Sequence, residues 1–406
     1  MTKKQDEKAK EPNLFNYEMT KDLPTTPLVK EIFSVLSGAV NGKEAMRRYK
    51  ANIYDVSHGK TKINTYMSKD GKRLHIEVEN NISKSVIEIP SLLELSKHSF
   101  AATKLFLYIM NKGIEQHVVT QTGKDIGVTF TLADMVKDGL YADVKSARRA
   151  FKEGYDILKE FEATGRILLK SGTVEGRKDV TPDADKARYM FIGRDIEKAG
   201  SPLPCKVYFN PLMNWDFLLH FYTTVPIWTF SLPKRAMNLM FWIFANARKN
   251  VGSIRAEKPC YITASYKSIQ AWLNLPRLDE TDTPKKEIIM PIHAAIQDIK
   301  DAHDNFKREV MDDVAKEKAA ATTDKERQEA EEKEAYYTAM FARPDFDITK
   351  EEPDGAKTKE ILESGKITAE INEPYTTKLL RIRRNATGIL LHNKATQDET
   401  EPAEQN

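Results

Sequence analysis

Cysteine is scarce in this sequence, because Cys205 and Cys260 are the two present among 406 residues. Two cysteines are too few for a disulfide framework or a cysteine-based zinc site, and they fit a reducing cytoplasm. Residues 1–11 are charged and lack the apolar segment of a signal peptide. The most apolar long stretch, residues 236–247, is too short to cross a bilayer. We therefore expect a cytoplasmic protein with no membrane partner.

The sequence also lacks the common signatures of catalysis. Its eight histidines are dispersed, and no His-x-His pair is present to hold the metal of a DNA-nicking enzyme. Gly59, Lys60 and Thr61 resemble part of a phosphate-binding loop, but Tyr54 stands where that motif needs glycine. We predict no catalytic residue, no metal site and no cofactor, so the chain is not expected to be an enzyme.

Charge is balanced in total but uneven along the chain. Lysine and arginine number 63 against 60 aspartates and glutamates, for a net charge of +3. Residues 300–363 hold 12 basic and 19 acidic residues, and residues 395–406 hold four acidic and no basic ones, which leaves +14 on the rest. This pattern predicts a basic globular protein with an acidic insert and an acidic tail, and it favours a polyanionic partner.

The first 95 residues predict two small pieces. Residues 1–27 are polar and include Pro24 and Pro27, which predicts a disordered leader. Residues 28–95 predict a small α+β piece that opens with a helix through Val29, Ile32, Val35 and Leu36. Alternating runs at 62–67 and 74–78 flank the Asp70-Gly71 turn of a tight hairpin, and residues 86–89 predict a third strand.

Residues 96–225 predict a first compact domain. Ser99 caps a helix over 100–112 that Gly113 is expected to stop. Thr131 caps a short helix over 132–138, Gly139 ends it, and Asp143 caps a longer helix over 144–161. The buried stripe predicted for this longer helix comprises Val144, Ala147, Phe151, Leu158 and Phe161.

The strands that follow complete this pattern. Strand-like runs at 166–170 and 187–192 flank a polar loop, and a third run covers 205–209. A short helix, a tight turn and a longer helix followed by a hairpin predict a winged helix, with the hairpin as its wing.

Residues 226–394 repeat the order more loosely. They predict a buried helix from Pro233 to Asn250, a short helix capped by Ser265, and a third helix opened by Thr283 and Pro284 that Pro291 kinks or splits. The charged insert, residues 300–363, predicts a helical hairpin over 300–341 whose second arm begins at the Thr323–Glu326 capping box. Strands at 367–371 and 378–382 are expected to form a second wing, and residues 395–406 a disordered acidic tail.

The strongest functional signal is a cationic face on the helix predicted at 144–161. Lys145, Arg148, Arg149 and Lys152 recur at three- and four-residue steps opposite the apolar stripe. Such a helix can enter the DNA major groove, where arginine pairs with guanine and lysine neutralises phosphates. The alternative is a solvated face in which Arg149–Glu153 and Lys152–Asp156 form ordinary ion pairs. The preceding turn and the following hairpin favour DNA binding.

Three weaker basic clusters are further candidates for phosphate contact, and charges that only add solubility are the alternative for each. Lys285 and Lys286 stand at a helix start, where the helix dipole disfavours cations and a nearby phosphate would relieve the conflict. The other two clusters lie in or next to the predicted wings: Arg177, Lys178, Lys186 and Arg188 in the first, and Arg381, Arg383 and Arg384 in the second.

The tandem order resembles the initiator Rep proteins of iteron-type plasmids, whose two winged-helix domains bind direct repeats in the origin. The resemblance rests on residues 99–161, where Thr131-Leu132-Ala133-Asp134-Met135 leads into Ser146-Ala147-Arg148-Arg149-Ala150-Phe151, and on residues 231–302. The fold class expected is α+β, with two tandem winged-helix domains, an N-terminal α/β extension and a charged helical-hairpin insertion in the second domain. The insertion and the extension depart from the family pattern.

The resemblance implies sequence-specific binding of double-stranded origin repeats, local melting, and recruitment of host replication proteins such as the helicase and its loader. The protein would bind as a monomer or as a homodimer. Two modules that read successive major-groove faces about 34 Å apart predict a target of about 20 base pairs. A winged-helix transcriptional regulator and a non-catalytic interaction scaffold stay open as alternative functions. For the acidic hairpin, contact with a partner protein or a second protomer and an inert spacer both stay open.

Overall fold

A computed structural model describes an α+β protein. The described residues are 20–25, 29, 32–33, 36, 54–58, 61–70, 73–79, 83–90, 92–118, 121, 126–167, 188–196, 204–210, 219, 222–249, 259–273, 275–372 and 375–376. Within these ranges, none of the helices combines the length and the apolar character that a membrane crossing requires. Most of the buried apolar side chains form one continuous core.

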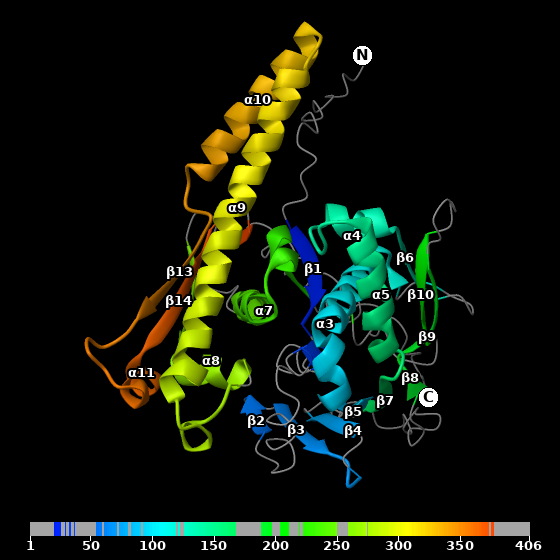
Figure 1. The fold of residues 1–406 in the computed structure, drawn as a ribbon, viewed down its shortest axis with the longest axis vertical. Coiled ribbons are helices and arrows are strands. Elements are labelled where there is room, and N and C mark those ends of the chain that lie inside the picture. Colours follow the sequence, from blue (N-terminus) through cyan, green and yellow to red (C-terminus); the bar gives the residue numbers. More distant parts are fainter. Residues whose placement is uncertain are drawn as a thin grey trace, which may run out of the picture.

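A six-stranded antiparallel sheet occupies the end of the molecule opposite the long hairpin (Figure 1). Its strands, in sheet order, are β2 (Tyr54–His58), β3 (Thr61–Met67), β4 (Arg73–Glu79), β5 (Ser83–Pro90), β7 (Glu162–Ile167) and β8 (Arg188–Tyr189). The strands predicted around the Asp70-Gly71 turn and at 86–89 are confirmed. The runs predicted at 166–170 and 187–192 pair as expected through β7 and β8. They do not form a separate wing, because β7 also pairs with β5 and so belongs to this sheet.

The first unit joins three helices to a three-stranded sheet. Its elements are α3 (Leu92–Glu115), β6 (Gly127–Phe130), α4 (Leu132–Lys137), α5 (Val144–Leu158), β9 (Phe191–Asp195) and β10 (Cys205–Phe209). The sheet order is β6-β10-β9: β10, the last of the three in the sequence, lies in the middle and pairs with both β6 and β9. The hairpin beside α5 is therefore β9–β10, which uses the strand predicted at 205–209.

Helix α3 is longer than its sequence signals predicted. It begins at Leu92 instead of after Ser99, and it runs through Gly113 to Glu115. Gly113 does not stop the helix. It is a site of close packing, because a Cβ there would lie 3.1 Å from Leu219 Cδ1. The run from Leu105 to Met110, which precedes the glycine, is fully buried, and this burial stabilises the helix.

The second unit repeats the order of elements. It contains α7 (Lys234–Lys249), β12 (Cys260–Ser265), α8 (Tyr266–Trp272), a π-helical turn η4 (Lys285–Ile289) that leads into α9 (Met290–Ala320), β13 (Phe346–Glu351) and β14 (Lys366–Ile371). The sheet order β12-β14-β13 again pairs the first strand with the third and the third with the second. Pro291 lies in the first turn of α9, where the missing N–H costs little, and the π-helical turn precedes it.

The expected partner of residues 367–371 in the second wing was wrong. The partner of residues 367–371 is β13, which lies inside the predicted insert, whereas residues 378–382 lie outside the described residues. The connection between β13 and β14 contains a short helix, α11 (Thr358–Ser364). The insert therefore supplies one strand of the sheet as well as the helical hairpin.

The predicted helical hairpin is confirmed. Helix α9 and α10 (Asp324–Phe341) lie side by side and extend beyond the rest of the molecule (Figure 1). The Thr323–Glu326 capping box starts α10, as expected. Val310, Val314 and Tyr337 form a small core between the two helices, separate from the main one. Charged pairs between the arms, Lys318–Glu334 at 2.7 Å among them, contribute little because they are half-exposed.

A two-stranded ribbon lies between the two units. Strand β1 (Thr20–Pro24) pairs with β11 (Tyr222–Pro226), which precedes the 3₁₀ turn η2 (Ile227–Ser231). Thr20–Pro24 belong to the segment predicted as a disordered leader, so that prediction was wrong for these residues. Asn111 Nδ2 of α3 donates to the carbonyl of Asp22 at 3.0 Å, which fixes the ribbon to the first unit.

Candidate nucleic-acid interface

The short helix α4 and the turn after it fix where α5 starts. The Asp134 amide donates to Thr131 Oγ1 at 3.0 Å, and the Thr131 amide donates to Asp134 Oδ2 at 2.8 Å, so the predicted capping box is present. Gly139 adopts φ +74°, a left-handed conformation that glycine takes without strain. The turn therefore has the shape that the sequence predicted at Gly139.

A lysine of α3 contacts the backbone of the turn that follows α4. Lys104 Nζ donates to the carbonyl oxygen of Leu140 at 2.9 Å, and it lies 4.7 Å from the centroid of the Phe100 ring and 5.5 Å from that of Tyr141. Burial lowers the pKa of Lys104 to about 8. Sequence reasoning missed this contact, because a lysine in an otherwise apolar helix gives no sign of which carbonyl it will reach.

Asp143 caps the N-terminus of α5. Its Oδ1 accepts from the Ser146 amide at 2.8 Å and its Oδ2 accepts from Ser146 Oγ at 2.9 Å. These hydrogen bonds hold the pKa of Asp143 below its usual range, so the carboxylate stays charged at the positive end of the helix dipole. The predicted helix start is confirmed.

The inner face of α5 packs closely on α3. Ala147, Phe151, Leu158 and Phe161 are buried as predicted, but Val144 is 42% exposed, so its place in the buried stripe was wrong. A Cβ at Gly154 would lie 2.8 Å from the carbonyl oxygen of Ala101. Glycine is needed there because the two helix backbones approach too closely for any side chain.

The outer face of α5 carries the predicted cations. Lys145, Arg149 and Lys152 are exposed, and Arg148 is half-exposed. Within the described part of the chain, Lys145, Arg149 and Lys152 form no ion pair within 4.0 Å, so the expected Arg149–Glu153 and Lys152–Asp156 pairs are absent. Lys145, Arg149 and Lys152 therefore present exposed positive charge along this face.

The β9–β10 hairpin contacts the C-terminal half of α5 through Arg194. Arg194 Nη1 donates to the carbonyl of Lys152 at 3.0 Å, and Nη2 lies 3.3 Å from Asp156 Oδ1. The guanidinium also lies 4.7 Å from the centroid of the Tyr155 ring. Arg194 was missed in the sequence because it acts across a strand–helix contact. The contact leaves the cations of the N-terminal half uncovered.

The other predicted site residues are not gathered with this face. Lys285 and Lys286 are exposed in η4, next to the exposed Glu287. Helices α9 and α5 lie on opposite sides of α7, β1 and α3 (Figure 1). The remaining predicted cations lie outside the described residues, except for Arg188, which is in β8 at a position whose side chain is not described: Arg177, Lys178, Lys186, Arg188, Arg381, Arg383 and Arg384.

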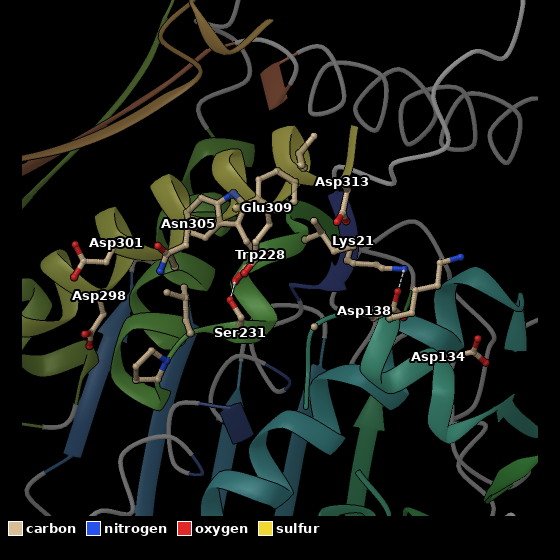
Figure 2. Close-up of a pocket in the computed structure, with 18 of the residues that line it drawn as sticks. Lys21, Asp134, Asp138, Trp228, Ser231, Asp298, Asp301, Asn305, Glu309 and Asp313 are labelled. Carbon is tan, nitrogen blue, oxygen red and sulfur yellow. Dashed lines mark hydrogen bonds and ion pairs between the residues drawn. The ribbon is translucent and has the colours of Figure 1, made fainter. Parts of the chain in front are cut away.

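A groove of about 980 Å³ separates α4 from α9 (Figure 2). Its α9 wall is acidic, with Asp298, Asp301, Glu309 and Asp313, and Trp228 lines it from η2. On the opposite wall, the buried Lys21 lies 3.2 Å from Asp138. The carboxylates of the α9 wall would repel a phosphate backbone, so this hollow is a poor place for a duplex. The outer face of α5 is the better candidate.

No family model, no curated protein and no solved structure matches this chain. Among the described residues, no three side chains of His, Cys, Asp or Glu gather as a metal site would require. The outer face of α5 therefore stands out by its geometry and its charge alone.

Proposed function

We propose that this chain is a sequence-specific double-stranded DNA-binding protein built from two tandem winged-helix units, with α5 as the recognition helix of the first. The observation that carries the proposal is the exposed set of Lys145, Arg149 and Lys152, which have no ion-pair partner within the described residues. A recognition helix needs its N-terminal half free to enter the major groove, and the contacts of Arg194 from the hairpin fall on residues 151–156 of α5.

The winged-helix assignment is supported by the topology that both units share. In each unit a helix, a strand and two helices precede an antiparallel pair of strands, and the first strand pairs with the last. In the first unit β7 and β8 intervene before this pair; in the second unit α10 precedes the pair and α11 lies within it. A hairpin beside the third helix is positioned to contact the DNA backbone. The second unit would add phosphate contacts through Lys285 and Lys286. The basic clusters Arg177–Lys178, between β7 and β8 in the sequence, and Arg381, Arg383 and Arg384, after β14, belong to the same proposal.

Within DNA binding, a replication initiator is the preferred function. Two linked modules bind with a raised effective concentration once the first is bound, which suits an origin with repeated sites. The protein would act in the cytoplasm, bind direct repeats as a monomer or homodimer, and recruit host proteins such as the helicase and its loader. Direct repeats of about 20 base pairs beside the gene would favour this role, whereas a palindrome over its own promoter would favour a transcriptional regulator.

Charge reversal on α5 tests DNA binding, and the same reversal in the second unit serves as its control. Arg148→Glu with Arg149→Glu should weaken binding to a selected duplex by at least about 100-fold, because each arginine–base pair contributes about 1–3 kcal/mol. Lys285→Glu with Lys286→Glu makes the same change in charge and should cost less than about tenfold. Gel shifts measure the affinities, and circular dichroism checks that both variants fold.

A salt titration separates DNA binding from the scaffold alternative. For the wild type, log K should fall linearly with log salt, with a slope of about −0.9 per phosphate contact. Equal affinity of the wild type and the Arg148→Glu, Arg149→Glu variant would remove α5 as the recognition helix. Absence of binding to any duplex at low salt would favour the scaffold.

A further inference from the structure

Val144 is the exposed apolar residue of α5. It is the first residue of the helix and is 42% exposed, whereas Ala147, Phe151 and Leu158 on the inner face are fully buried. A single exposed valine on a protein surface needs no explanation by itself. Its position distinguishes it, because it stands one residue after the Asp143 cap and one before Lys145.

Helical spacing places Val144 at the border between the buried face and the cationic face. It lies three and seven residues before the buried Ala147 and Phe151, and four residues before Arg148, so its exposed side adjoins the cations. Side chains in a helix tilt toward its N-terminus. A helix that enters a groove with its N-terminal half first therefore presents Val144 deepest, ahead of Arg148.

The partner surface in the major groove contains one apolar group. Thymine carries a C5-methyl there, whereas the other bases present hydrogen-bond donors and acceptors. An apolar side chain flanked by cations fits a thymine methyl beside a polar base edge. A cytosine or guanine at the same place would leave polar atoms against the valine methyls without a partner.

We propose that Val144 is a specificity-determining residue that packs on the C5-methyl of a thymine next to the base read by Arg148 or Arg149. This inference rests on the proposed DNA-binding function. The recognised class of duplex then has a thymine and a guanine at neighbouring steps under the start of α5. Val144 selects the thymine by apolar contact, and an arginine selects the guanine by hydrogen bonds.

The test pairs a protein change with a base change that removes the same contact. The full chain is used to select bound duplexes from a random library, and each thymine of the selected site is then replaced singly by deoxyuridine, which lacks the methyl. At one thymine the wild type should lose about fourfold in affinity, as expected for one methyl group withdrawn from an apolar contact. Val144→Ala should lose a similar factor and be insensitive to the replacement at that thymine.

Leu278→Ala supplies the matched control, because Leu278 is an exposed apolar residue of the second unit. This variant should keep the fourfold response to deoxyuridine. A selected site at which every deoxyuridine replacement leaves the wild-type affinity unchanged, or at which the Val144→Ala and uracil effects add independently, would overturn the role of Val144 while leaving DNA binding intact. Recovery of no preferred sequence would overturn both the role of Val144 and the proposed function.

Discussion

Helix α5 of the first unit has 15 residues and begins at the Asp143 cap, whereas α9 of the second unit has 31 residues and continues a π-helical turn. Both occupy the same place in the order of elements and lie beside a sheet of the same strand order. α5 ends inside its unit, and α9 runs out of its unit into the helical hairpin (Figure 1). The shared topology therefore supports two different surfaces.

The two helices differ in the charge that they expose to a partner. On α5 three exposed cations follow one another without a paired carboxylate among the described residues. In the turn η4 before α9, Lys285 and Lys286 are followed by the exposed Glu287. The exposed Met290 begins α9, and Asp298 and Asp301 in its next turns line the groove of Figure 2. Under the proposed function, the first unit reads the sequence of the duplex and the second adds phosphate contact.

The two units fix their third helices through different contacts. Removal of the Asp345 carboxylate, which contacts α9, should give the largest loss of stability. Asp345, which is 3% exposed, lies 2.9 Å from His303 Nε2 and accepts from Lys307 Nζ at 2.7 Å. Asp345→Asn should lower the free energy of unfolding by about 3 kcal/mol, because it removes the buried negative charge that pairs with Lys307 and replaces one of the two acceptor oxygens by a donor. Urea denaturation at pH 7 measures it.

The pH dependence of the Asp345→Asn effect follows from the pKa of Asp345. Burial alone would raise this pKa, but hydrogen bonds from His303 and Lys307 outweigh it and hold the pKa below its usual range. The carboxylate therefore stabilises the fold above pH about 4, and its contribution is lost as the pH falls through the depressed pKa. Asp347→Asn is the control, because Asp347 is half-exposed and its 3.5 Å pair with Lys300 should contribute at most about 1 kcal/mol. Equal losses in the two variants would contradict the role of Asp345.

The close approach of α3 and α5 gives the next largest effect. In the first unit Gly154 lets the two backbones meet, whereas neither α7 nor α9 of the second unit contains glycine. Gly154→Ala should cost about 2 kcal/mol, because the added methyl overlaps the carbonyl of Ala101 and the helices must separate. Gly193→Ala, whose Cβ would lie 3.5 Å from Tyr208, should change stability by less than about 0.5 kcal/mol. A stable Gly154→Ala variant would mean that α3 and α5 are not packed this closely.

The sequence predicted the local parts of this fold well and the long-range parts poorly. Thr131, Gly139 and Asp143 act on backbone groups within four residues, so their caps and turns could be read directly. Strand partners are chosen across the chain, so nothing near residues 166–170 indicated that β7 would pair with β5. The candidate site followed the same division, because the cations of α5 were predicted from helical spacing while Arg194 and Lys104 were not.

Lys104 should give the smallest effect on stability, and it tests whether its contact with Leu140 fixes the turn between α4 and α5. Burial lowers its pKa to about 8 in the folded chain, while lysine in an unfolded chain titrates near about 10.4. The unfolded chain thus binds more protons between these values, and the wild type should gain about 1 kcal/mol of stability from this residue between pH 7 and pH 9. Lys104→Met should lack this gain in the free energy of unfolding. Lys137→Met is the control, because Lys137 is exposed in α4 and its removal shows the effect of losing one lysine charge. Parallel stability curves for the wild type and Lys104→Met would mean that Lys104 is solvated, and the turn would then be held by Gly139 and the two helix caps instead of by α3.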